Sequence, residues 1–122
     1  FTTLAERLPA EAVVEVLNGA LSRMADAVFK HEGTLDKFTG DGLMAIFGAP
    51  VGRPDDAARA VTAGLDMIAS IRALDAARAP GSPELAIGIG VHTGPAIVGN
   101  IGSEKRLDYT AVGDTVNLAS RI

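Results

Sequence analysis

Residues 35–42 place a lysine and a carboxylate close together beside a predicted turn. Lys37 and Asp41 are four positions apart, and on an ideal strand that spacing puts both side chains on one face. One interpretation is a turn aspartate beside a solvated lysine, because Asp-Gly suits a hairpin turn. The other is a metal-binding carboxylate at an exposed tip. With no neighbouring His or Cys, Asp41 would select a hard cation, Mg²⁺ or Mn²⁺, and would need a second carboxylate from elsewhere.

Residues 108–121 form the second segment whose side chains could support chemistry. Asp114 or Thr115 is placed to cap a short helix, within which Asn117 and Arg121 are spaced i and i+4. That spacing displays a neutral donor and a permanent cation on one helix face, which suits an anion. The alternative is an ordinary solvated polar face.

Several enzyme classes are excluded by motifs that the sequence lacks. It contains no G-x-x-x-x-G-K-[ST] phosphate loop, no G-x-S-x-G elbow and no H-E-x-x-H. Residues 88–94 resemble a dinucleotide fingerprint, but the third glycine comes one place late and a predicted strand surrounds it. We interpret these glycines as allowing a strand to pack closely or bulge. His31, at a predicted helix end, is expected to be a solvated cation.

The first half of the chain predicts two helices that flank a hairpin. Apolar residues recur at helical spacing over about 10–31, and Gly33 marks the C-terminal end of that helix. Residues 34–40 and 43–47 read as strands joined at Asp41-Gly42. A second helix follows residues 54–56 and ends before Pro80, with Val61, Leu65 and their helical neighbours forming its apolar face.

The second half predicts three strands, over residues 85–91, 96–98 and 106–112, followed by a helix over 114–122. The resulting order, α-β-β-α-β-(β)-β-α, suits an α+β domain of the ferredoxin-like, split βαβ kind. That topology requires one more strand before Phe1.

Composition predicts a single soluble domain. The 122 residues are 48% hydrophobic and 21% charged, and the formal net charge of −4 lacks the basic surplus that nucleic-acid binding requires. The absence of cysteine favours a cytoplasmic setting. No apolar run approaches the ~18 residues of a membrane span. Because the chain begins at Phe1 without an initiator Met or basic segment, we expect it to be a piece of a longer protein.

Four ordered motifs together resemble the catalytic domain of class III nucleotidyl cyclases, the adenylate and guanylate cyclases. They are Phe1-Thr2, residues 37–48 (KFTGDGLMAIFG), residues 88–94 (GIGVHTG) with 99–102 (GNIG), and residues 109–121 (YTAVGDTVNLASR). The resemblance covers almost the whole chain. It implies the cyclase form of the split βαβ fold.

The resemblance also implies roles for individual residues. Asp41 would be one of two metal-binding aspartates, holding two Mg²⁺ or Mn²⁺ ions with a partner aspartate that would precede Phe1. A phosphate-binding lysine would lie beyond Ile122. The residues implied to contact substrate are Lys37 and Thr110 at the purine, Asn117 and Arg121 at the ribose and α-phosphate, and Phe1 and Thr2 at the triphosphate.

The activity implied is conversion of ATP to 3′,5′-cyclic AMP and pyrophosphate. Lysine can donate to adenine N1, whereas guanine carries a hydrogen there, so Lys37 favours ATP. The hydroxyl of Thr110 can either donate or accept, which leaves its preference open. In this family Lys37 and Asp41 would meet Thr110, Asn117 and Arg121 across a head-to-tail homodimer. Two alternatives are a guanylate cyclase and an inactive nucleotide-binding or regulatory dimer of the same fold.

Overall fold

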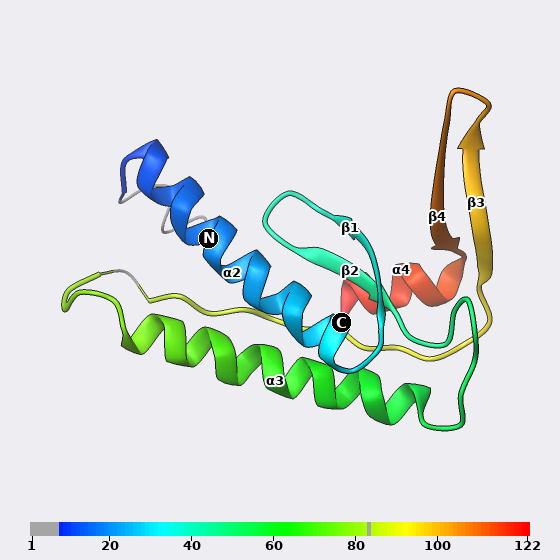
Figure 1. The fold of residues 1–122 in the computed structure, drawn as a ribbon, viewed down its shortest axis with the longest axis horizontal. Coiled ribbons are helices and arrows are strands. Elements are labelled where there is room, and N and C mark those ends of the chain that lie inside the picture. The colour runs from blue at the N-terminus through cyan, green and yellow to red at the C-terminus, as the bar shows by residue number, and fades with distance from the viewer. Residues whose placement is uncertain (1–7, 83) are drawn as a thin grey trace.

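The elements alternate in a helix-hairpin pattern, described here from a computed structural model over residues 8–82 and 84–122. They are helix α2 (Ala10–Lys30), strands β1 (Thr34–Phe38) and β2 (Leu43–Ile46), helix α3 (Asp56–Ala76), strands β3 (Ile97–Ser103) and β4 (Arg106–Val112), and helix α4 (Asp114–Arg121). Figure 1 shows α2 and α3 on one side of the β1–β2 hairpin, with the β3–β4 hairpin projecting at the other end. The α+β class is therefore confirmed.

Helix α2 ends as predicted, but Gly33 has a different role from the one expected. The residue in the left-handed conformation is Glu32, with φ +59°, and the Gly33 amide donates to the Val28 carbonyl at 2.9 Å. A Cβ on Gly33 would lie 2.6 Å from the ring of Phe47. Glycine is needed here because an aromatic ring packs directly on its backbone.

The core lies between α2 and α3. Its buried members are Ala20, Met24, Ala27, Val28, Met67, Ile71 and Leu85. The periodicity of α2 predicted its inner face correctly. The predicted face of α3 was right only in part, since Ile71 is 1% exposed and lies in the core, but Val61 is 50% and Leu65 62% exposed. Helix α3 carries apolar residues on more than one side, so periodicity alone could not select the buried one. None of the helices in residues 8–82 and 84–122 is long and apolar enough to cross a membrane.

The β1–β2 hairpin turns one residue earlier than predicted. Thr39 and Gly42 exchange backbone hydrogen bonds of 2.8 and 3.3 Å, so the two loop residues are Gly40 and Asp41. Gly40 has φ +68°, which a glycine at the first loop position of a type II′ turn adopts without strain. Asp41 keeps its predicted place at the tip. Because β1 ends at Phe38, the expectation that Lys37 and Asp41 share a strand face does not hold.

The predicted strand at residues 85–91 does not pair with either hairpin within the described chain. Burial alternates along it, with Leu85 buried, Ile87 and Ile89 partly buried, and the residues between them exposed. The strand was predicted from an apolar run interrupted by glycines, but in the structure its apolar side chains pack against the core between the helices and form no hydrogen-bonded ladder. The Leu85 amide donates to Asp75 Oδ1 at 2.9 Å.

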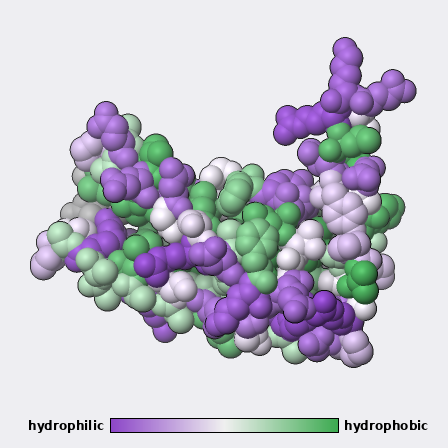
Figure 2. Space-filling view, viewed as in Figure 1, coloured by the Kyte–Doolittle hydropathy of each residue, from purple (hydrophilic) through white to green (hydrophobic). Residues whose placement is uncertain are grey.

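The two hairpins therefore form separate two-stranded antiparallel sheets, β1-β2 and β3-β4. In β3–β4 the pairing is continuous from Ile97 opposite Val112 to Ser103 opposite Arg106. This ladder confirms both predicted strands and extends the first of them. Figure 2 shows polar side chains covering the far end of the projecting hairpin.

Candidate active site

The hairpin tip displays Lys37 and Asp41 to solvent. Both residues are exposed, and neither side chain has a hydrogen bond or ion pair with another described residue. Figure 1 shows the turn between β1 and β2 at the end of the hairpin away from β4. An exposed ammonium and an exposed carboxylate here are both available to a ligand.

The strand that carries Lys37 is tied to β4 by a side-chain hydrogen bond. Thr110 is 6% exposed, and its hydroxyl donates to Asp36 Oδ2 at 2.5 Å. Asp36 sits at an irregularity in the β1–β2 ladder, where Leu35 pairs with Ala45 and Lys37 pairs with Met44. The structure thus brings β1 and Thr110 together within one chain. This differs from the expectation that Lys37 and Thr110 reach one site from opposite subunits.

Helix α4 presents Asn117 and Arg121 on one exposed face, as their spacing predicted. Neither side chain bonds to another residue in the described ranges. The predicted side-chain cap is absent, because the N-cap position belongs to Gly113. Thr115 donates instead to the Pro95 carbonyl at 2.5 Å, which anchors the start of α4 to the segment before β3.

Two of the glycines in residues 88–94, Gly90 and Gly94, allow α4 to pack closely. A Cβ on Gly90 would lie 2.2 Å from the Ala119 carbonyl oxygen, and one on Gly94 would lie 2.7 Å from Thr115 Oγ1. Close approach, as interpreted from the sequence, is therefore confirmed. These glycines position the helix that carries Asn117 and Arg121.

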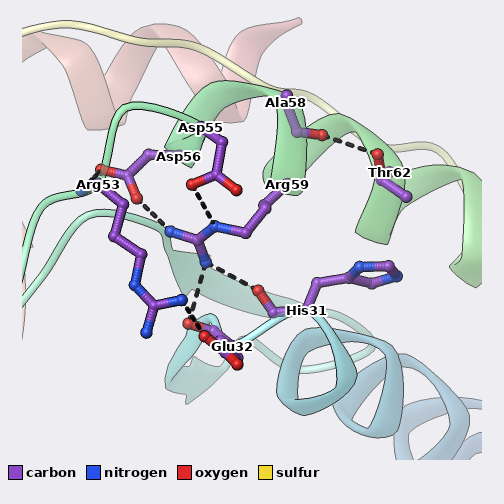
Figure 3. Close-up of polar contacts among 8 residues, drawn as sticks. All are labelled: His31, Glu32, Arg53, Asp55, Asp56, Ala58, Arg59 and Thr62. Atoms are coloured by element: carbon purple, nitrogen blue, oxygen red, sulfur yellow. Dashed lines mark hydrogen bonds and ion pairs between the residues drawn. The ribbon is translucent and has the colours of Figure 1, made fainter.

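A cluster around Arg59 holds the base of the β1–β2 hairpin against α3 (Figure 3). The guanidinium donates to the backbone carbonyls of His31 and Glu32 at 2.8 and 3.3 Å. It also pairs with Asp55 at 3.1 Å and with Asp56, and it lies 5.7 Å from the centre of the Phe47 ring. Arg59 therefore satisfies carbonyls at the end of α2.

Arg53 extends the Arg59 cluster by pairing with the exposed carboxylate of Glu32. This hydrogen bond and the charge of Glu32 raise the pKa of Arg53 above its usual value. The backbone amide of Arg53 donates to Asp56 Oδ2 at 2.8 Å. Arg53 thereby connects the α2 end to the loop before α3.

His31 is not the solvated cation that the sequence suggested. Its side chain is 17% exposed, and Nε2 lies 2.5 Å from Asp66 Oδ2 on α3. Lys30 reaches the same carboxylate oxygen at 3.3 Å. The hydrogen bond from His31 lowers the pKa of Asp66 below its ordinary value. Desolvation opposes this shift, and the hydrogen bond and charge of Lys30 add to it.

The described residues supply only part of a metal site. They contain no group of three or more His, Cys, Asp or Glu side chains that could hold an ion. Asp41 offers one carboxylate, the donor type that Mg²⁺ and Mn²⁺ prefer. Its chemistry fits the expected metal ligand, and the remaining ligands must come from elsewhere.

Most of the predicted site residues are accessible, and the structure adds one that was missed. Lys37, Asp41, Asn117 and Arg121 are exposed, whereas Phe1 and Thr2 lie outside the described residues. The sequence did not single out Asp36, because a lone strand carboxylate forms no recognisable motif with its neighbours. Its hydrogen-bond partner Thr110 is 74 positions away in the chain. Hollows lined by Arg23, Lys30 and Asp66, and by Phe29 and Phe38, include none of the predicted site residues.

The β1–β2 hairpin displays a lysine and an aspartate to solvent, and helix α4 displays an amide and a guanidinium. The chain belongs to the adenylate and guanylate cyclase catalytic domain family, whose model matches residues 1–122. The motifs that suggested this family are thereby confirmed.

Similar proteins carry both cyclase names. The chain is 41% identical over 123 residues to adenylate cyclase 1 of Rhizobium meliloti, a match that covers 100% of the chain but 18% of that protein. The crystal structure of the guanylyl cyclase Cya2 matches with a TM-score of 0.92 at 47% identity, covering 100% of this chain and 62% of that one. The crystal structure of the adenylyl cyclase CyaB from P. aeruginosa matches with a TM-score of 0.89 at 41% identity, covering 98% of this chain and 63% of that one. These matches support the cyclase fold, but the choice of purine has to be argued from individual residues.

Proposed function

We propose that this chain is the catalytic domain of an adenylate cyclase, which converts ATP to 3′,5′-cyclic AMP and pyrophosphate. The observation that carries the choice of ATP is the exposed, unpaired ammonium of Lys37 in β1. An ammonium donates to adenine N1 but would face the hydrogen on guanine N1. The match to an adenylate cyclase of Rhizobium supports the same choice.

In the proposed reaction the ribose 3′-oxygen forms a bond to the α-phosphorus, and the bond from the α-phosphorus to the oxygen that bridges to the β-phosphate breaks. The 3′-hydroxyl proton is released to solvent water as pyrophosphate leaves. Asn117 and Arg121 are the donors we assign to the ribose and the α-phosphate. A fixed amide and guanidinium stabilise charge as it develops, without reorganising. Their exposure on one face of α4 suits this role.

Asp41 is the residue we assign to the metal. Two ions, Mg²⁺ or Mn²⁺, would lower the barrier by stabilising charge on the reacting oxygens. Since a single carboxylate does not hold such ions, we infer that the natural protein is longer than this chain and supplies a second aspartate upstream of Phe1 and a phosphate-binding lysine beyond Ile122. Phe1 and Thr2 are assigned to the triphosphate through their backbone amides.

We further propose that the active unit is a head-to-tail homodimer. Asp41 and Arg121 are exposed and do not pair with each other in the described part of the chain. A two-fold axis would place the metal-binding half of one copy opposite the Asn117/Arg121 half of the other. Each dimer would then contain two equivalent sites. We place this domain in the cytoplasm, with no nucleic-acid partner.

The direct test is product formation by the purified natural protein with Mn²⁺. We expect cyclic AMP from ATP to form far faster than cyclic GMP from GTP, and Lys37→Glu to reduce that preference, because a carboxylate accepts from guanine N1. Equal or reversed rates in the wild type would favour a guanylate cyclase, as the similarity to Cya2 allows. Nucleotide binding without either product would favour an inactive regulatory module.

A further inference from the structure

One polar contact joins the two sheets beside the residues assigned to the purine. The Thr110 hydroxyl donates to Asp36 Oδ2 at 2.5 Å, although the residues belong to different hairpins. Asp36 directly precedes Lys37 in β1, at the position where the ladder shifts register. Such irregularities re-aim a side chain, and here the carboxylate reaches Thr110 in β4.

This contact fixes which way the Thr110 hydroxyl can act. A hydroxyl has one proton and two lone pairs, whereas an ionised carboxylate only accepts. Because the Thr110 hydroxyl donates its one proton in the hydrogen bond to Asp36, it can only accept a hydrogen bond from any further partner. The residue is 6% exposed, so water can do little to compensate a mismatched partner at this position.

Purines differ in the group that would meet such an acceptor. Adenine carries an amino group at its six position, which donates, and guanine carries a carbonyl oxygen there, which accepts. An acceptor-only hydroxyl is complementary to the amino group and repels the carbonyl. The orientation that Asp36 imposes therefore discriminates in the same direction as the ammonium of Lys37.

We propose that Asp36 is a positioning residue that makes Thr110 an obligate acceptor and so selects a 6-aminopurine over a 6-oxopurine. This rests on the proposed function, because it presumes that Thr110 faces the base of the bound nucleotide. It assigns a specificity role to a residue that does not itself contact the substrate. The competing explanation is that the Asp36–Thr110 hydrogen bond has only a structural role and stabilises the packing of the two hairpins.

The two explanations separate in the variant Asp36→Asn. Its amide can donate to Thr110, which frees the hydroxyl proton for a guanine carbonyl. We expect the ratio of kcat/KM for ATP to that for GTP to fall about five- to tenfold, the effect of one net hydrogen bond. In a Thr110→Val background the same Asp36→Asn change should leave the ratio unaltered, since no hydroxyl remains to be oriented.

Two further variants serve as a control and as an alternative in this experiment. Asp108→Asn removes a similar charge from an exposed site on β4 and should leave the ratio unchanged. If Asp36→Asn does not fold, Asp36→Ala should still lower the ratio, because the hydroxyl is then free to rotate. Thermal unfolding of each protein separates specificity from stability.

The outcomes distinguish this inference from the function on which it rests. The inference is wrong if the wild-type protein prefers ATP and Asp36→Asn either lowers kcat/KM for ATP and GTP by the same factor or lowers stability alone. Asp36 then has only a structural role. A shift in ratio that persists in the Thr110→Val background would also overturn it. If the wild type forms no cyclic product from either nucleotide, the proposed function fails and the inference fails with it.

Discussion

The helix-paired region from α2 to α3 and the region from β3 to α4 are built differently. The first supplies all of the buried core except Leu85, and it holds the Arg59 cluster. In the second, the buried residues described are Thr110 and Ala111, and α4 has none. Its large apolar side chains include several exposed ones, among them Ile97 at 71% and Leu107 at 57%.

This contrast places the stabilising core in the first region, although the exposed Lys37 and Asp41 of the proposed site also lie there. The first region is stabilised by its own packing, whereas the second displays Asn117, Arg121 and apolar surface with little internal support. Within the proposed homodimer, a second copy would cover that surface and complete the site. Substitution of buried core residues in the first region should therefore affect folding, whereas substitution of the exposed Arg121 in the second should affect turnover.

The largest expected effect is on turnover, in the second region. Arg121→Ala should lower kcat by about 10²–10³-fold, the usual result of removing one fixed donor to developing charge. Because Arg121 is exposed and unpaired among the described residues, unfolding should be almost unchanged. The matched control is Arg72→Ala, an exposed arginine on α3 that should alter neither property. Equal kcat values for the two variants would contradict the contrast.

The next effect is on folding, in the first region. Ile71 is 1% exposed, and Ile71→Ala should reduce the free energy of unfolding by about 2–5 kcal/mol through lost burial and a residual cavity. Ile97→Ala in β3 should cost less than about 0.5 kcal/mol in the separated monomer. Chemical denaturation of both variants measures the difference. A larger loss for Ile97→Ala would show that the projecting hairpin has packing of its own.

These two regions also differ in how far the sequence predicted them. Helical periodicity and the Asp-Gly turn signal are local, so α2, α3 and the β1–β2 hairpin were predicted close to their observed bounds, with the turn itself one residue too late. Whether residues 85–91 pair as a strand depends on which strands lie alongside, and an apolar run interrupted by glycines does not contain that information. Likewise Lys37, Asp41, Asn117 and Arg121 belong to short motifs, whereas the Asp36–Thr110 bond depends on the meeting of two hairpins 74 positions apart.

A smaller loss of stability should follow Arg59→Ala. The side chain is 14% exposed and donates to two carbonyls and two carboxylates, so its removal should cost about 2 kcal/mol, in the range of hydrogen bonds to charged groups. Arg53→Ala, which breaks the more exposed pair in the same cluster, should cost less. Thermal unfolding checks the order of the two variants. A larger loss of stability for Arg53→Ala than for Arg59→Ala would show that Arg59 is not the main stabilising residue of the cluster.

The smallest effect is a pH dependence at Asp66. Its pKa is lowered in the folded protein, so its ionised form contributes stability above the ordinary carboxyl pKa near 3.8, and that contribution is lost as the pH falls through the folded value. Between about pH 5 and pH 2 the wild type should therefore lose stability more steeply than Asp66→Asn. Melting temperatures across this range measure the two slopes. Parallel slopes would mean that the His31–Asp66 contact contributes nothing through ionisation.

The most direct test of the shared-site account is complementation between the two regions. Asp41→Ala and Arg121→Ala, each almost inactive alone, should regain activity when mixed under conditions that allow subunit exchange. A mixed head-to-tail dimer collects both lesions in one site and leaves the other intact, so random pairing predicts a ceiling of about a quarter of wild-type activity. No recovery, with mixed dimers demonstrated by differential tags, would contradict the account and mean that each site is built within one chain.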